Sequence, residues 1–178
     1  MEVFFTADTH YGHSNVLKFK RDNDKPLRDF ANIDEMNEVL IERHNAVVGV
    51  NDRVYHLGDA VFGKSNMHLL RRLNGKMTLI AGNHDHYDGG LASYAEYFDE
   101  ILASKELTMS KNDRGIMTHI PIHTSQLDYR FTYNLHGHLH DIELDDPRYL
   151  NMGVECWNFT PVNLSVIKET LVRKGIIK

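Results

Sequence analysis

The sequence predicts an α/β fold of the α+β type. In the first half, short apolar runs alternate with stretches of helical periodicity, and each run leads into a polar loop. In the second half, two extended runs flank the turn 112–115 and indicate a hairpin, which adds antiparallel strands. The chain has 178 residues, of which 42% are apolar, so we expect one domain with a sizeable core over residues 1–178.

The first half is predicted to alternate strands with helices. The strands are the apolar runs 3–7, 53–57 and 77–81. The clearest helix start is Asn32, which stands three residues before Glu35 in the pattern of a capping box. The other predicted elements are a short helix capped by Ser14, an exposed loop over 21–31, a helix capped by Ser65 that runs to Leu73, and a helix over 91–98.

The second half is predicted to be richer in antiparallel strand. One strand over 101–109 enters the turn, and a strand over 115–119 returns beside it. Asn163 is predicted to cap the last helix, which Gly175 follows. The remaining predicted strands are 133–136 and 151–157.

Composition argues against several classes of protein. A net charge of −5 disfavours a chain whose whole surface binds nucleic acid, because such domains usually carry a basic excess. Cys156 is the only cysteine, so no intrachain disulfide can form. The sequence shows no secretory signal and no apolar run near ~18 residues, so we expect a cytoplasmic protein without a membrane partner. A solvated loop is favoured over a local basic strip for Lys18, Lys20, Arg21, Lys25 and Arg28.

Potential ligands follow the predicted strands directly. The segment Gly82-Asn83-His84-Asp85 comes after the strand 77–81, and ligands in open α/β sheets bind at the carboxyl ends of strands. Alone, this segment is more often turn chemistry than a catalytic site. Similar endings recur at Asp8-Thr9-His10, Gly58-Asp59, His119 and His136-Gly137-His138-Leu139-His140, which favours the functional interpretation.

These side chains are the ligands that divalent transition metals prefer. Imidazole nitrogen combines with carboxylate or carbonyl oxygen, and two ions ~3.5–4 Å apart need a carboxylate that bridges them. In Asp8-Thr9-His10 and in His138-Leu139-His140, the i, i+2 spacing would point both side chains the same way from extended backbone. The candidate ligands are Asp8, His10, Asp59, Asn83, His119, His138 and His140.

This ordered set resembles the motifs of the calcineurin-like metallophosphoesterase family. The resemblance covers residues 3–140, and the tail from Asn151-Met152-Gly153-Val154 to Pro161-Val162 is similar to small bacterial and phage members. It implies a four-layer α/β/β/α sandwich in which two central mixed sheets are flanked by helices. It also implies a dinuclear centre, in which Asp8, His10 and His140 hold one ion, Asn83, His119 and His138 hold the other, and Asp59 bridges them.

The resemblance also implies a mechanism. A hydroxide between the two metal ions is the expected nucleophile, because coordination lowers the pKa of bound water toward ~7. His84 would protonate the leaving oxygen or donate to the phosphate, with Asp85 as its orienting partner. The cofactors would be two divalent transition metal ions, manganese first, with iron, nickel, cobalt or zinc as alternatives.

One departure from the family pattern concerns the second motif. Many members follow its aspartate with an Asp-Arg pair that orients the catalytic histidine and contacts phosphate, whereas this chain has Ala60-Val61-Phe62-Gly63. The phosphate contact would then fall to Lys64 or His13, and His123 is a further candidate for substrate contact. Closeness to the protein-phosphatase branch is therefore in doubt, and nothing in the sequence explains the orientation of His84.

The sequence thus predicts a metal-dependent phosphoester hydrolase. Without a cap domain or a long insertion its site should be exposed, which favours phosphodiesters, including nucleotides and nucleic acid, over small monoesters. The alternatives are a phosphomonoesterase or protein phosphatase, and a non-catalytic scaffold on the same fold. The presence of every ligand and of His84 disfavours the scaffold. The sequence gives no indication of the oligomeric state.

Overall fold

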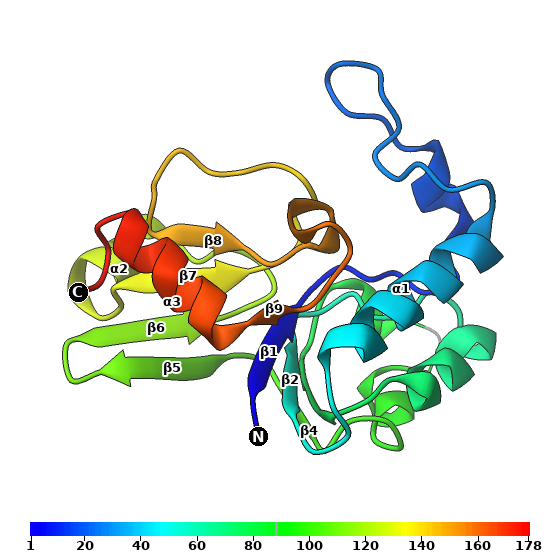
Figure 1. Cartoon of the computed structure of the whole chain (residues 1–178), viewed down its shortest axis with the longest axis horizontal. Coiled ribbons are helices and arrows are strands. Elements are labelled where there is room, and N and C mark those ends of the chain that lie inside the picture. Colours follow the sequence, from blue (N-terminus) through cyan, green and yellow to red (C-terminus); the bar gives the residue numbers. More distant parts are fainter. Residues whose placement is uncertain (88) are drawn as a thin grey trace.

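The computed structural model describes residues 1–87 and 89–178, which form two β-sheets flanked by helices (Figure 1). The strands are β1 (Val3–Thr6), β2 (Arg53–His56), β3 (Lys76–Ile80), β4 (Glu100–Leu102), β5 (Lys105–Ser110), β6 (Asp113–Met117), β7 (Tyr133–His136), β8 (Tyr149–Asn151) and β9 (Val162–Asn163). The α-helices are α1 (Ile33–Val47), α2 (Thr124–Tyr129) and α3 (Leu164–Arg173). The 3₁₀ helices are η1 (Ser14–Lys18), η2 (Lys64–Arg72), η3 (His84–His86), η4 (Leu91–Tyr94) and η5 (Val154–Trp157).

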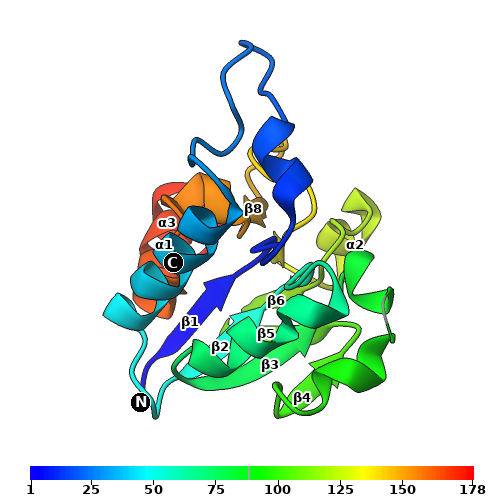
Figure 2. The ribbon, with the colours of Figure 1, turned by 90° about the vertical axis from the view of Figure 1, so that its right-hand side faces the viewer.

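Both sheets are mixed, which confirms the predicted fold class. The five-stranded sheet has the order β4-β3-β2-β1-β9, in which only β9 runs antiparallel to its neighbour among the described strands. Figure 2 shows β1, β2, β3 and β4 of this sheet. The four-stranded sheet has the order β5-β6-β7-β8, in which β5 is antiparallel to β6. Because parallel strands place their carboxyl ends at one edge of a sheet, the loops after β1, β2 and β3 open on the same side.

The central strands of the five-stranded sheet are buried on both faces. In β1, Phe4 belongs to a core shared with α1 and η2, whereas Phe5 belongs to a second core shared with the four-stranded sheet and α3. Val54 and Tyr55 of β2 divide in the same way. Since successive side chains of a strand point to opposite faces, both positions must be apolar. This explains why these strands appear in the sequence as continuous apolar runs.

The long helices begin where the sequence predicts. The side chain of Asn32 accepts a hydrogen bond from the backbone N–H of Glu35 at the start of α1. Asn163 accepts one from the N–H of Ser165 at the start of α3. Both caps are local contacts between residues two or three apart, so the sequence pattern contains the necessary information.

The short helices differ from the predictions. Ser14 and Ser65 cap nothing, because η1 and η2 follow His13 and Gly63 and have no side-chain hydrogen bond at their N-caps. Gly63 has a φ of 83°, which turns the chain into η2 before Ser65 is reached. The predicted helix over 91–98 is limited to η4.

Two predicted strands are wrong in their extent. The strand predicted over 101–109 is divided between β4, which pairs with β3, and β5, which pairs with β6 in the other sheet. The strand predicted over 151–157 ends at Asn151, and the chain then forms η5. A run of strand-forming residues indicates extended backbone, but the partner strand decides where pairing stops.

Residues 19–31 project from the body of the fold in both views (Figures 1 and 2). The prediction of an exposed loop is correct for most of this segment but wrong for Leu27 and Arg28, which are 6% and 1% exposed. Arg28 therefore belongs neither to a solvated loop nor to a surface basic strip. Among the described residues, the helices are all too short or too polar to cross a membrane.

Gly115 in β6 provides a test of the packing in the four-stranded sheet. A Cβ atom at Gly115 would lie 2.1 Å from Cε2 of Tyr133, whose ring is fully buried and cannot move aside. We expect Gly115→Ala to lower the free energy of unfolding by about 1–3 kcal/mol, the usual cost of overpacking a core. Urea denaturation measures this loss.

Gly49→Ala serves as the control for this substitution. The nearest atom to a Cβ at Gly49 is 3.2 Å away, at the end of the Asp52 side chain, which has to shift by only a few tenths of an ångström, so we expect a change within about 0.5 kcal/mol. Equal losses in the two variants would contradict the packing argument.

Candidate metal centre

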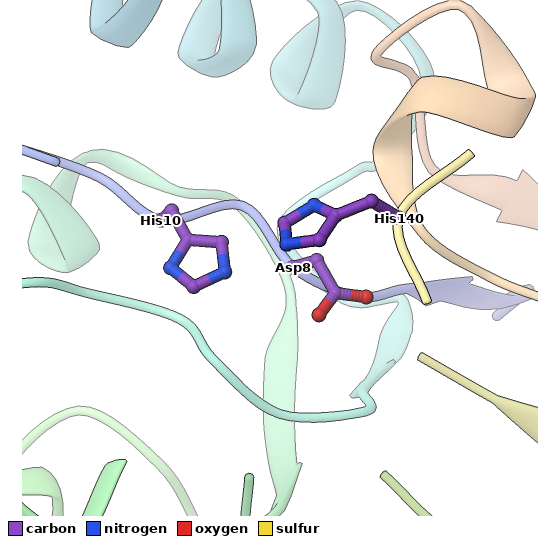
Figure 3. A group of neighbouring side chains, drawn as sticks. All are labelled: Asp8, His10 and His140. Atoms are coloured by element: carbon purple, nitrogen blue, oxygen red, sulfur yellow. The ribbon is translucent and has the colours of Figure 1, made fainter. Parts of the chain in front are cut away.

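The loops after β1, β2, β6 and β7 bring two groups of potential ligands together. Within each group, one ligand atom from every residue lies within 4.8 Å of the others. The first site consists of Asp8, His10 and His140, and the second site consists of Asp59, His119 and His138. Figure 3 shows the side chains of the first site gathered around one space, with Asp8 and His10 from the segment after β1 and His140 from the segment after β7.

Asp59 connects the two sites. Its Oδ2 atom lies 3.7 Å from Nε2 of His10 and 3.4 Å from Nε2 of His119. The Oδ1 atom of Asn83 lies 3.0 Å from Nε2 of His119, so Asn83 joins the second site. The structure therefore brings together every ligand that the sequence predicts, and it places a carboxylate between the two groups.

The ligands are held on left-handed backbone. The φ angles of Asp8, His10, Asp59, His138 and His140 are 56°, 50°, 56°, 71° and 53°. The extended backbone predicted for the two i, i+2 pairs is therefore wrong. Non-glycine residues rarely adopt positive φ, and each such residue costs roughly 1–3 kcal/mol. Strain of this kind persists where the surrounding structure imposes it, and it is concentrated at functional sites.

Glycines in the motifs leave room for the ligand carboxylates. A Cβ atom on Gly82 would lie 2.2 Å from Oδ1 of Asp59, and one on Gly137 would lie 2.6 Å from Oδ2 of Asp8. The backbone N–H of His138 donates to the Asp8 carboxylate, 2.9 Å from Oδ2. Gly82, next to Asn83, and Gly137, next to His138, are therefore required by the close approach of an aspartate carboxylate.

Asp85 supports the ligand loops through the backbone. Its buried carboxylate accepts hydrogen bonds from the N–H groups of Asp59, Ala60 and Gly82, each 2.8–3.0 Å away. The prediction that Asp85 orients His84 is not supported, because within the described structure no hydrogen bond joins this carboxylate to the His84 ring. The carboxylate is already used to hold Asp59 in place.

His84 lies beside the ligands and is oriented by its ring neighbours. Its backbone N–H donates to Oδ1 of Asp59 at 2.8 Å, and its Nε2 atom lies 3.9 Å from Oδ2 of that residue. The centroid of its ring is 5.4 Å from that of His10, 6.0 Å from Phe62 and 5.8 Å from Tyr87. The side chain is 34% exposed, so a substrate can reach it. Among the described residues, the contacts that limit rotation of this ring are therefore with other rings, and its Nδ1 atom has no hydrogen-bond partner.

The three predicted substrate contacts have different surroundings. The ring of His13 stacks on Phe62 with centroids 4.2 Å apart, and Lys64 lines a hollow together with His84. His123 instead caps α2, where Nδ1 accepts a hydrogen bond from the N–H of Ser125. In the part of the chain that the structure describes, no hydrogen bond or ring contact joins His123 to the ligands or to His84.

Burial and neighbouring charges set the protonation of the ligands. Burial raises the pKa of Asp8 to about 7. Burial would also raise the pKa of Asp59, but the hydrogen bond and charge of His119 outweigh it and lower that pKa to about 2. For His10, burial and then the charge of Arg28 hold the pKa well below its usual value, so the ring is neutral. For His119, burial would lower the pKa, but the hydrogen bond and charge of Asp59 outweigh it and raise that pKa to about 9. Metals bind neutral imidazole and ionised carboxylate, so metal binding would displace the protons that Asp8 and His119 carry near pH 7.

The donor atoms fit a divalent transition metal. Both ring nitrogens of His10 are buried, and neither has a hydrogen-bond partner among the described residues. Buried polar atoms nearly always have a partner, and a metal ion at the first site would supply one. Imidazole, carboxylate and amide oxygen together suit manganese, iron, cobalt, nickel and zinc, so the donor set does not select one element.

Sequence reasoning missed two residues beside the first site. Arg28 was assigned to the charged loop, although its guanidinium is buried. Glu155 lies in η5, and its Oε1 atom is 2.9 Å from Nδ1 of His140. The only signal in the sequence was the position of Glu155 within the tail that is similar to small family members.

Known proteins are similar to this chain over most of its length. The model of the calcineurin-like phosphoesterase superfamily domain matches residues 1–169. The uncharacterized protein MJ1445 of Methanocaldococcus jannaschii is 31% identical over 188 residues, which cover 98% of this chain and 93% of that protein. The gene 66 protein of Mycobacterium phage L5 is 25% identical over 189 residues, which cover 87% of each chain.

A solved structure has the same fold. The crystal structure of AQ665, a protein of unknown function from Aquifex aeolicus, is similar with a TM-score of 0.74 at 23% sequence identity. The similarity covers 94% of this chain and 98% of that chain. It supports the arrangement of two mixed sheets flanked by helices, and it concerns the fold alone.

Proposed function

The chain belongs to the calcineurin-like phosphoesterase superfamily, and we propose that it is a metal-dependent phosphoester hydrolase with a dinuclear centre. In this proposal the first site binds one ion, the second site binds the other together with Asn83, and Asp59 bridges them. The observation that carries the proposal is the meeting of both ligand groups around the Asp59 carboxylate. Manganese is the ion to test first.

The bound ions would lower the pKa of coordinated water and neutralise charge on the phosphoryl oxygens. The protein's own contribution is to hold the ligands in place before the substrate arrives, so that little reorganisation is needed during the reaction. Asp85 does this for Asp59 through backbone N–H groups, and Gly82 allows the close approach. His84 holds a proton at Nε2 for the leaving oxygen.

We propose phosphodiesters as the substrate class, with nucleotides as the first members to test. Phe62 and Tyr87 flank His84 and are 39% and 64% exposed. Exposed aromatic rings of this kind provide surfaces on which bases stack. Lys64 adds a positive charge beside His84 for a phosphate group. The leaving group of a diester can therefore stack on these rings while His84 contacts the departing oxygen.

Removal and return of metal tests the function directly. We expect chelation followed by dialysis to abolish hydrolysis of bis(p-nitrophenyl) phosphate, because the proposed chemistry depends on both ions. Addition of Mn²⁺, Ni²⁺, Co²⁺ or Fe²⁺ to the metal-free protein should restore activity to different extents. The rate is followed by release of p-nitrophenolate, with p-nitrophenyl phosphate assayed in parallel.

The two substrates separate the alternatives. Faster cleavage of the diester supports the phosphodiesterase proposal, whereas faster cleavage of the monoester would assign a phosphomonoesterase. A protein that binds two ions and cleaves neither substrate, nor a set of nucleotide diesters, would contradict the proposal and favour a scaffold.

A further inference from the structure

Arg28 and Glu155 form a buried ion pair beside the first site. Both side chains are 0% exposed, and Oε1 of Glu155 lies 2.7 Å from Nη2 and 2.8 Å from Nε of Arg28. The two residues come from distant parts of the chain, the projecting segment 19–31 and η5. Removing two charges from water is costly, and a buried pair is often no more stabilising than apolar residues of the same size. Stability alone therefore does not explain the pair.

Arg28 also bonds the strained loop after β1. Its Nη1 atom donates to the carbonyl oxygen of Thr9 at 2.8 Å, and its Nη2 atom donates to that of Asp8 at 2.5 Å. These carbonyls belong to the segment in which Asp8 and His10 have positive φ. Because the guanidinium is a rigid planar fork, it holds the two consecutive carbonyls in one relative orientation. Arg28 thereby fixes the direction of two ligands of the first site.

Glu155 contacts His140, the third ligand of the first site. Its Oε1 atom is 2.9 Å from Nδ1 of His140, and an ionised carboxylate can only accept there. Nδ1 of His140 therefore carries the proton, which leaves the lone pair of Nε2 free for a metal ion. A carboxylate in this position orients a ligating histidine and increases its basicity.

In the second site, the support of His119 among the described residues is a backbone carbonyl and not a carboxylate. There, Nδ1 of His119 lies 2.7 Å from the backbone carbonyl oxygen of Leu57, a neutral acceptor. The two sites thus differ in how their histidines are supported. The positive charge of Arg28 would by itself oppose a cation nearby, but the Glu155 carboxylate that it contacts offsets this charge.

We infer that Arg28 and Glu155 are positioning residues for the first site, and that this site binds its ion more tightly than the second site does. The inference rests on the proposed function, since it requires that both ligand groups bind metal. Its consequence is an order of loading, in which the first site fills before the second. Arg28 then links the segment 19–31 to metal binding at the first site.

Cobalt titration of the metal-free protein tests this inference. Co²⁺ is added against a competing chelator while the visible absorption of the bound ion is recorded, and the wild type should show two distinct affinities. Glu155→Gln should weaken the tighter site by about 10–100-fold, the range for a group that supports a ligand, and should alter its cobalt spectrum. The cobalt affinity of the weaker site should change by less than about 3-fold in the same variant.

Double variants assign the affected site. Glu155→Gln combined with His138→Ala, in which the second site is impaired, should still show the full loss of affinity. When Glu155→Gln is instead combined with His10→Ala, in which the first site is impaired, it should cause almost no further loss of cobalt affinity. Arg28→Lys should also weaken the tighter site, because an ammonium group cannot bond both carbonyls and the carboxylate as a guanidinium does.

Glu38→Gln is the matched control. Glu38 also pairs with an arginine, Arg72, through two contacts of 2.6 Å, but this pair is at the surface. Glu38→Gln should leave the cobalt affinities of both sites unchanged. If Glu155→Gln does not fold, Glu155→Asp replaces it, because the shorter carboxylate keeps a charge for Arg28 but withdraws from His140.

The outcomes distinguish this inference from the proposed function. Unchanged affinities in the folded Glu155 variant would overturn the inference and leave the proposed function intact. Equal weakening of both sites would also overturn it. A wild-type protein that binds no cobalt at all would instead contradict the proposed function.

Discussion

Replacement of His84 by alanine is expected to lower turnover of a nucleotide diester by about 10²–10⁴-fold, the range for a positioned acid or base, with metal content unchanged. The contact of His84 with the ligands runs through its backbone N–H, which donates to Oδ1 of Asp59 at 2.8 Å and is retained in alanine. Its Nε2 atom is 3.9 Å from Oδ2 of Asp59, beyond hydrogen-bond distance. The ring can therefore be removed without removing a ligand.

The choice of leaving group sharpens this test. p-Nitrophenolate is a stable anion that needs little protonation as it departs, whereas the hydroxyl of a nucleoside is a poor leaving group without a proton. If His84 is a general acid, the loss of kcat should be larger for a nucleotide diester than for bis(p-nitrophenyl) phosphate. An equal loss on both substrates would indicate that His84 binds the phosphate instead.

His86→Ala is the matched control for His84. His86 lies in the same 3₁₀ helix, but its side chain is exposed. Its replacement should leave kcat and metal content near the wild-type values. Unchanged turnover of the nucleotide diester in His84→Ala would remove His84 from the mechanism, and loss of metal from that variant would reassign it to support of the ligands.

Asp59→Asn is expected to lower the affinity of both sites together, by more than the roughly 10–100-fold typical of groups that only support a ligand. Oδ2 of Asp59 is within 3.7 Å of a histidine nitrogen from each site, so one atom serves both. Asparagine keeps the size of the side chain and its oxygen acceptor, but it loses the charge that offsets two cations. Hydrolysis should fall with the metal content.

The measurement is metal per protein by atomic emission after gel filtration, with the fold checked by circular dichroism. Asp52→Asn is the control, because its carboxylate accepts the backbone N–H groups of Glu2 and Gly49 at the start of β2, away from the ligands. It should retain wild-type metal content. Retention of two tightly bound ions in Asp59→Asn would refute the bridging assignment.

The identities of the site residues were predictable, whereas their backbone conformation was not. The ordered motifs resemble one family closely enough to name the residues from Asp8 to His140 that the structure brings together in the two groups. The same spacing suggested extended backbone, but both members of each i, i+2 pair are left-handed. An isolated chain would avoid such angles, and only contacts from elsewhere, such as the N–H of His138 on Asp8, compensate for them.

The role of Asp85 also could not be predicted from the local sequence. Its place next to His84 in the sequence suggested a catalytic pair, since neighbours in a motif often act on one another. In the fold its carboxylate points to the backbone of residues 59, 60 and 82. The packing of β2 beside β3 decides which buried N–H groups need an acceptor. The local sequence does not contain that information.

The sequence by itself determined the features that depend on neighbours in the chain, namely the caps at Asn32 and Asn163 and the apolar strands. The candidate ligands followed from the ordered motifs that resemble the family. Only the tertiary structure decided how the extended run over 101–109 is divided between two sheets, and that Arg28 is buried against Glu155. The physical reason is that strand pairing and burial of a charge are set by partners far away in sequence. Arg28 and Glu155 are separated by 127 positions, and they meet only because the fold brings η5 beside the loop that follows β1.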